Sequence, residues 1–144
     1  MEISVMDRAR IGDAAKLANR LWDEDAERAK EFEACLQQQD FVIFLAYEAA
    51  VPVGFAQCQL RRDYVEGCDT SPVGYLEGIY VDENVRGAGV ARALLSQCEA
   101  WAKQKGCTEF ASDCELDNEA SIRFHAKVGF TEQNRIVCFK KTLQ

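Results

Sequence analysis

The stretch from Tyr75 to Lys105 constrains this chain more than any other. A short apolar run, Tyr75 to Val81, leads through a polar turn into RGAGVA (Arg86 to Ala91), and an amphipathic segment continues to about Lys105. The first N–H groups of a helix have no internal partner, and the helix dipole places partial positive charge there. Glycines remove the Cβ atoms that would hold an anion away from these groups. Strand, glycine-bearing turn and helix in succession therefore predict a phosphate-binding site.

The composition indicates one globular domain that covers residues 1–144. Hydrophobic residues make up 48% of the chain, charged residues 28%, and there are only two prolines, a composition unlike that of disordered chains. No run approaches the roughly 18 apolar residues of a membrane helix. The first residues, MEISVMDRAR, lack the pattern of a signal peptide. We therefore expect no membrane association and a cytoplasmic location.

The charge balance argues against nucleic acid as a partner. Acidic residues outnumber basic ones by 24 to 17, which gives a net charge of −7, whereas nucleic-acid binding depends on basic patches. An acidic protein is compatible with a cationic substrate drawn to an acidic cleft. The seven cysteines form no C-x-x-C pair, and His125 is the single histidine. No zinc set of the usual spacing can be assembled, so we expect no metal.

The hydrophobic periodicity predicts an α+β fold with the order β-α-α-β-β-β-α-β-α-β-β around a mixed sheet. Turn and cap signals place the elements along the chain. The expected strands and helices cover about residues 2–5, 13–22, 26–36, 41–47, 53–60, 75–81, 90–105, 109–112 and 118–128, with a closing strand or strand pair over 130–142. Residues 61–74 are predicted to form a loop of about a dozen residues, a length that is more often functional than idle.

Two separated motifs resemble the GNAT superfamily of acyl-CoA-dependent N-acyltransferases. Arg86-x-x-Gly89-x-Ala91 matches the family's Q/R-x-x-G-x-G/A pattern at the predicted strand-to-helix turn. Asn118-x-Ala120, followed by FHAKVGF (124–130), is similar to the family's N-x-x-A…Y-x-x-x-G-F helix. The likeness covers the whole chain. It implies a mixed, mostly antiparallel sheet flanked by helices.

A closer likeness is to the aminoglycoside 6'-N-acetyltransferases. It depends on Leu21-Trp22, the loop 62–72, LEGI (76–79) and Ala111-Ser112-Asp113. It implies acetyl transfer from acetyl-CoA to the 6'-amine of aminoglycoside antibiotics, by direct attack in a ternary complex, and a homodimer that pairs through the C-terminal strand. Two alternatives stay open. One is a GNAT enzyme for another amine, such as a polyamine or a protein N-terminus, and the other is a non-catalytic acyl-CoA-binding regulatory module.

The resemblance also assigns the cofactor residues. In the family, backbone N–H groups of the signature turn bind the pyrophosphate of acetyl-CoA, and the preceding strand pairs its backbone with the pantetheine arm. A backbone amide of this strand is also placed to stabilise the oxyanion of acyl transfer. For the helix-starting Asn118, a contact to the pantetheine arm and a helix N-cap are both open. The expected cofactor-binding residues are Ile79, Tyr80, Val81, Arg86, Gly87, Ala88, Gly89, Val90, Ala91, Arg92 and Asn118.

The chemistry of acetyl transfer directs attention to carboxylates. An amine near pH 7 is mostly protonated, so a carboxylate must bind the ammonium and accept its proton, directly or through water. Glu77 lies in an otherwise apolar run and Asp113 ends the neighbouring predicted strand, where similar enzymes place substrate-binding carboxylates. Which of them is the base stays open, and both are also ordinary strand-end acids. His125 stands where many family members carry a tyrosine near the departing sulfur, so proton donation and packing are both open.

Three further residues are candidates for the aminoglycoside site by resemblance. Trp22, followed by Asp23-Glu24-Asp25, is expected to form a wall of the site, although a core aromatic at a helix end would look the same. Tyr64 on the long loop is expected to hydrogen-bond the antibiotic or to pack the loop. Asn134 falls where relatives place a substrate contact, and Asp69 is a nearby acid with less support.

Overall fold

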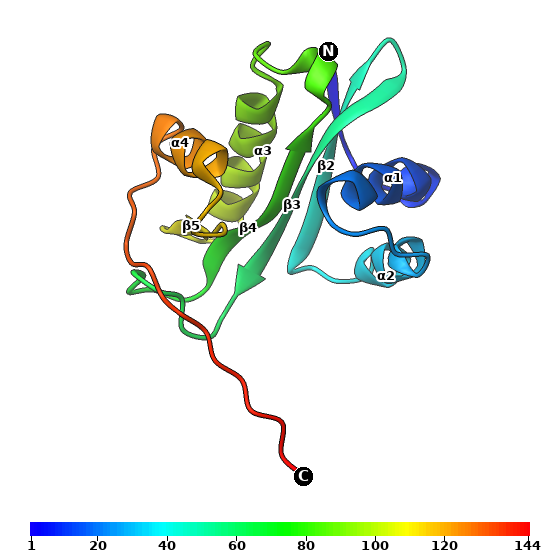
Figure 1. The fold of residues 1–144 in the computed structure, drawn as a ribbon. Helices are drawn as coiled ribbons and strands as arrows, with labels where there is room; N and C mark the ends of the chain where they lie inside the picture. Colours follow the sequence, from blue (N-terminus) through cyan, green and yellow to red (C-terminus); the bar gives the residue numbers. More distant parts are fainter.

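The computed structural model describes residues 1–144 and contains one five-stranded sheet (Figure 1). The strands follow one another in the order β1-β2-β3-β4-β5. The first four are antiparallel neighbours, and β5 pairs with β4 in parallel. Their bounds are β1 Glu2–Val5, β2 Phe41–Glu48, β3 Val51–Arg61, β4 Val73–Val81 and β5 Phe110–Ser112.

Helices cover both faces of the sheet (Figure 1). On one side lie α1 (Ile11–Leu21) and α2 (Arg28–Cys35), and on the other lie α3 (Val90–Gln104) and α4 (Glu119–Lys127). The alternation of side chains along a strand explains the two layers. The Ile43 side of β2 packs in the cluster of α1 and α2, whereas Val42 and Phe44 pack in the cluster of α3. Both faces of the central strands are buried, as the continuous apolar run of β2 predicts.

The predicted order is confirmed from β1 through α4, with shifts at the element ends. One of these shifts concerns α1, which begins at Ile11 and not at Asp13. A short 3-10 turn (Arg8–Arg10) precedes it, and the carboxylate of Asp7 accepts a hydrogen bond from the Arg10 N–H at 3.1 Å. Asp13 lies inside the helix and accepts a hydrogen bond from the hydroxyl of Tyr47 at 2.8 Å. The helix begins earlier because an alternative cap lies upstream.

The predicted closing strands are wrong for this chain on its own. Residues 130–144 form no helix or strand, and the C-terminal segment runs away from the sheet (Figure 1). A strand needs a partner edge to satisfy its N–H and C=O groups, and this segment pairs with none. Its apolar side chains stay exposed, to 68% at Ile136, 75% at Val137, 92% at Phe139 and 85% at Leu143.

A β-bulge in β4 changes which residues face which helix layer. Gly78 lies opposite Gln57 and Leu76 lies opposite Cys58, so Glu77 is one extra residue on β4. Leu76 and Ile79 consequently both pack toward α3 although they are three residues apart. Bulges of this kind redirect a side chain next to a functional site.

None of the helices combines the length and the apolar character that a membrane span requires.

Candidate active site

The candidate site lies where strands β4 and β5 separate after a short pairing. β5 pairs with β4 only from Gly74 to Leu76, so the rest of β4 has a free edge on this side. The predicted cofactor strand, Ile79 to Val81, lies on this free edge and pairs with β3 on its other edge. Unpaired backbone groups on a strand edge accept an extended ligand as an additional strand. This geometry suits a linear arm laid along β4.

The turn after β4 presents a row of unsatisfied N–H groups. Gly87 and Gly89 have φ of 86° and 82°, and no atom lies within 4 Å of a Cβ built on either residue. The first backbone hydrogen bond of α3 runs from the Ala93 N–H to the Gly89 carbonyl, at 3.0 Å. The N–H groups of residues 87–92 therefore have no backbone acceptor. Because the left-handed conformation and the open space both favour glycine, the turn is built for the close approach of an anion.

Arg86 fixes this turn to the strand before it. Its Nε donates a hydrogen bond to the carbonyl of Val81 at 2.8 Å, and its guanidinium lies 5.8 Å from the ring centre of Tyr80. The side chain thus has a structural contact in addition to its predicted cofactor role. Asn118 likewise forms the N-cap of α4, with its Oδ1 accepting from the Ser121 N–H at 3.1 Å. The N-cap interpretation of Asn118 is confirmed, and its Nδ2 has no partner in the protein.

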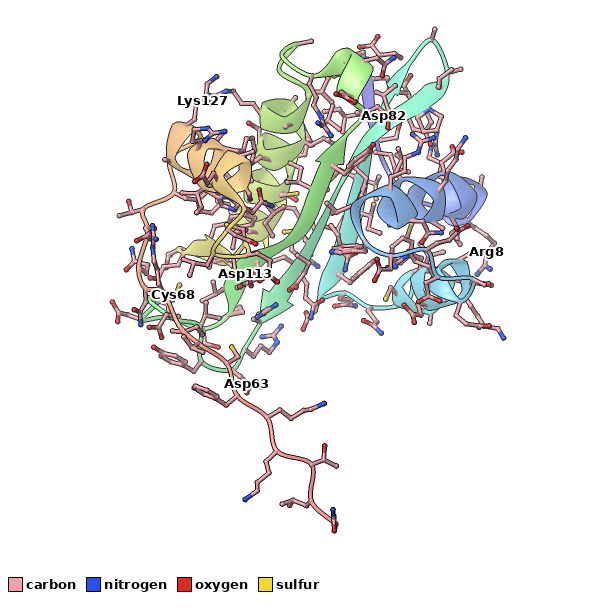
Figure 2. The ribbon with its side chains drawn as sticks, in the orientation of Figure 1. Arg8, Asp63, Cys68, Asp82, Asp113 and Lys127 are labelled. Carbon is pink, nitrogen blue, oxygen red and sulfur yellow. The ribbon has the colours of Figure 1, made fainter.

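The two candidate carboxylates are joined through two residues for which the sequence predicted no role in the site. Arg61, at the end of β3, binds both oxygens of Glu77, with Nε–Oε2 at 2.9 Å and Nη2–Oε1 at 2.7 Å. Its guanidinium stacks 3.4 Å from the ring centre of Tyr75. The hydroxyl of Tyr75 donates a hydrogen bond to Asp113, which lies just beyond β5 (Figure 2). Burial, together with this bond, raises the pKa of Tyr75, which therefore remains a donor at neutral pH.

Glu77 borders an open cavity of about 390 Å³ next to the long loop. The side chain of Glu77 is only 17% exposed because the bulge turns it beside Arg61. Asp113, by contrast, is exposed. The cavity is lined by Gln59, Leu60, Arg61, Arg62, Asp63, Tyr64 and Glu77. The structure therefore brings the predicted Tyr64 and Glu77 into one site.

Trp22 lies against the residue that follows Glu77. A Cβ built on Gly78 would lie 2.4 Å from the indole Cζ2, so only glycine leaves room for this contact. The indole also packs edge-on against Phe55, with ring centres 5.8 Å apart, and Arg28 lies 5.3 Å from its ring centre. These contacts support the interpretation of Trp22 as a core aromatic, and its position beside the acid-bearing strand is compatible with the predicted wall of the substrate site.

The long loop is held at both ends by carboxylates. Glu66 accepts hydrogen bonds from the hydroxyl of Tyr64 at 2.6 Å and from Nδ2 of Asn134 at 2.5 Å. The bond from Tyr64 is the main cause that lowers the pKa of Glu66. At the other end, Glu109 accepts hydrogen bonds from the N–H groups of Asp69 and Thr70 at 2.9 and 2.8 Å. Two predicted substrate residues, Tyr64 and Asn134, are therefore connected through Glu66, while Tyr64 stays 79% exposed.

His125 connects α4 to β5. Its Nδ1 lies 2.7 Å from the carbonyl oxygen of Ser121, which can only accept, so Nδ1 carries the proton. Its Nε2 lies 2.8 Å from Oγ of Ser112 and accepts a hydrogen bond from that hydroxyl in the neutral ring. The ring also packs 5.0 Å from the ring centre of Phe130. These contacts support the packing interpretation, although Ser112 places the ring close to the point where β4 and β5 separate.

We expect His125→Ala to lower kcat by less than about tenfold, because the contacts of His125 are mainly structural. General acid–base groups contribute about a hundredfold or more. Steady-state kinetics at saturating concentrations of both substrates, with thermal unfolding of the same preparation, will separate the two roles. A thousandfold fall in kcat with an unchanged melting temperature would show instead that His125 is the proton donor.

The fold and this site match a known family. Residues 11–130 match the model of the acetyltransferase (GNAT) family. The chain therefore belongs to the GNAT acetyltransferase family.

Relatives extend the likeness to the whole chain. The chain is 41% identical over 144 residues to an aminoglycoside N(6')-acetyltransferase type 1 of Acinetobacter haemolyticus, covering 99% of both chains. It is 38% identical to the enzyme of the same name from Salmonella typhimurium, covering 98% of this chain and 99% of the relative.

Solved structures agree. A crystal structure of an aminoglycoside antibiotic 6'-N-acetyltransferase from Acinetobacter haemolyticus, in the apo form, superimposes with a TM-score of 0.95 at 40% identity and full coverage of both chains. AAC(6')-Iy in complex with the bisubstrate analogue CoA-S-monomethyl-acetylneamine gives a TM-score of 0.94 at 35% identity, covering 99% of this chain and 98% of that one.

Proposed function

We propose that this protein transfers the acetyl group of acetyl-CoA to the 6'-amine of aminoglycoside antibiotics and thereby confers resistance. The observation that carries the proposal is the pair of linked acids, Glu77 and Asp113, placed where β4 and β5 separate and on the strand that leads into the glycine turn. Whole-chain relatives named aminoglycoside N(6')-acetyltransferases support it. Acetylation removes a positive charge and a donor from a drug whose binding to RNA depends partly on charge.

The residues for acetyl-CoA are those of the turn and the free edge. The N–H groups of residues 87–92 would hold its pyrophosphate, and the backbone of Ile79, Tyr80 and Val81 would pair with its pantetheine arm. The free Nδ2 of Asn118 is available to the same arm. Acetyl-CoA supplies the acetyl group as a thioester. In this proposal the N–H groups of the turn hold the negative charge of the pyrophosphate and no metal takes part.

The acids act on the incoming amine. Glu77 or Asp113 binds the ammonium and then accepts its proton, directly or through water, so that a neutral amine attacks the acetyl carbon. As the new C–N bond forms, the C–S bond breaks and the departing thiolate takes up a proton. We assign Glu77 as the base because it is less exposed than Asp113 and lies on β4 itself. Trp22, Tyr64 and Asn134 would form the walls that hold the antibiotic rings.

A thiol-release assay tests the proposed activity. Purified protein and acetyl-CoA are mixed with a thiol reagent and with kanamycin, spermidine or no amine. We expect thiol release only with kanamycin. Release only with spermidine would assign the protein to another amine, and no release with any amine would make it an acyl-CoA-binding module.

We further propose that the protein is a homodimer in which the C-terminal segment pairs with a second copy of the chain. The outer edge of β5 pairs with no strand, and residues 136–143 carry exposed apolar side chains without a partner. An open sheet edge and an extended apolar segment complement each other. A second copy satisfies both, because each chain supplies one edge and one segment.

Removal of residues 136–144 is expected to convert this dimer to a monomer. Light scattering coupled to size exclusion should give the full chain twice its 16.2 kDa and the shortened chain a single copy of the protomer mass. Phe139→Asp, which keeps the length, should weaken the dimer in the same way because it places a charge in an apolar contact. A full chain that remains monomeric at micromolar concentration would contradict the proposal.

A further inference from the structure

The proposed ammonium site of Glu77 is already filled by a cation of the chain itself. Arg61 engages both carboxylate oxygens of Glu77, at 2.7 and 2.9 Å. A guanidinium in this fork arrangement saturates the strongest acceptor positions of a carboxylate. An incoming ammonium cannot take these positions while Arg61 holds them. For the amine to take these positions, Arg61 must leave Glu77.

The surroundings of Arg61 favour its departure. The guanidinium end of the pair is accessible, since the side chain of Arg61 is 40% exposed while that of Glu77 is 17% exposed, so water can solvate Arg61 once it leaves Glu77. Arg61 is the last residue of β3 and borders the 390 Å³ cavity, so its side chain has space on the loop side. Asp63 lines the same cavity and forms no ion pair, which offers Arg61 a second carboxylate.

We propose that Arg61 is a displaceable counter-ion that occupies the ammonium site of Glu77 until a polycationic substrate replaces it. The proposal rests on the proposed function, in which Glu77 receives the amine. Arg61 thus sets specificity through competition. A compound with one ammonium exchanges one positive charge for another at Glu77 and gains little. A polycation makes the same exchange while its other ammonium groups reach Asp113 and the acids of the loop, so it displaces Arg61 more readily.

Kinetics of Arg61→Gln test this competition. We expect KM for kanamycin to fall about fivefold, the upper end of the range measured for partly solvated ion pairs, with kcat within about threefold and KM for acetyl-CoA unchanged. For 6-amino-6-deoxyglucose, an amino sugar with a single ammonium, kcat/KM should rise by about the same factor or more. Arg61→Lys, which keeps the charge, should stay close to the parent protein. Arg61→Met, whose stem still covers the ring of Tyr75, should behave as Arg61→Gln and guards against a packing defect.

Arg8→Gln is the matched control, because Arg8 pairs with Glu33 at 2.5 Å across the sheet from Asp113 (Figure 2). It removes the same charge from the protein, so an equal fall in its KM would reveal a general charge effect and overturn the proposal. A KM for kanamycin that is unchanged or raised in Arg61→Gln would also overturn it and make Arg61 a positioning residue for Glu77. Failure of the proposed function itself is distinct, since the parent protein would then release no thiol with kanamycin.

Discussion

Glu77→Gln is expected to lower kcat/KM for kanamycin by about a hundredfold to a thousandfold. The substitution keeps the shape of the side chain but removes both the charge that binds the ammonium and the acceptor for its proton. General bases contribute about a hundredfold to ten-thousandfold. Glu77 is the extra residue of the β4 bulge and is only 17% exposed, so no other carboxylate of the strand can take its place. The measurement is steady-state kinetics across the pH range in which the parent protein is active.

Two comparisons make the Glu77 result specific. Asp113→Asn should cost less, about tenfold, because Asp113 is exposed and reaches Glu77 only through Tyr75 and Arg61. Glu33→Gln removes the acid of the distant pair with Arg8 and should leave the kinetics unchanged. A larger loss in Asp113→Asn than in Glu77→Gln, together with loss of the acidic limb of the pH profile, would assign the base to Asp113.

Gly89→Ala is expected to raise KM for acetyl-CoA about tenfold or more, with a small loss of stability. The protein itself has room for the new methyl group, because no atom lies within 4 Å of it. The left-handed backbone, with φ at 82°, costs alanine about 1–2 kcal/mol. The methyl group would occupy the space in which the pyrophosphate meets the N–H groups. KM for the aminoglycoside should change little, because the cavity beside Glu77 is lined by residues 59–64 and 77 and by no residue of the turn.

Gly106→Ala is the control for backbone strain. Gly106 also has a positive φ, 91°, and open space around its Cβ position, but it follows the C-terminal end of α3. Its replacement should lower the melting temperature by a similar amount while KM for acetyl-CoA stays unchanged. If both variants raise KM equally, the effect of Gly89 comes from strain in α3, and the turn does not bind the cofactor.

The parts of the fold that depend on local pattern could be predicted from the sequence. The run of β4, the glycine turn and the periodicity of α3 lie within some thirty consecutive residues, so their signals are contiguous. The N-cap of α4 could likewise be predicted, because asparagine is favoured at this position of a helix. The closing strands could not be predicted correctly, because a strand is defined by its partner as much as by its own β-forming residues. Residues 130–142 contain β-forming residues, but within one chain they pair with no strand.

The candidate site shows the same division. Glu77 and Asp113 were identifiable because a charge interrupts or ends an apolar run. Arg61 and Tyr75 were missed because their roles depend on the β3–β4 register and on the bulge at Glu77, which bring together side chains that are 16 residues apart in the case of Arg61 and Glu77. A basic residue at the end of β3, across from the acid-bearing strand, was the available signal. In the sequence, however, Arg61 could equally be the first residue of the polar loop that follows β3.

The most direct test compares neomycin with paromomycin, two aminoglycosides that differ in carrying an amine or a hydroxyl group at the 6' position. We predict that the protein releases thiol from acetyl-CoA with neomycin, and that mass spectrometry of the product finds one acetyl group on the ring that carries the 6'-amine. Paromomycin should give no amide product. Equal acetylation of both compounds would place the reacting amine elsewhere and contradict the account of Glu77 as the receptor of the 6'-ammonium.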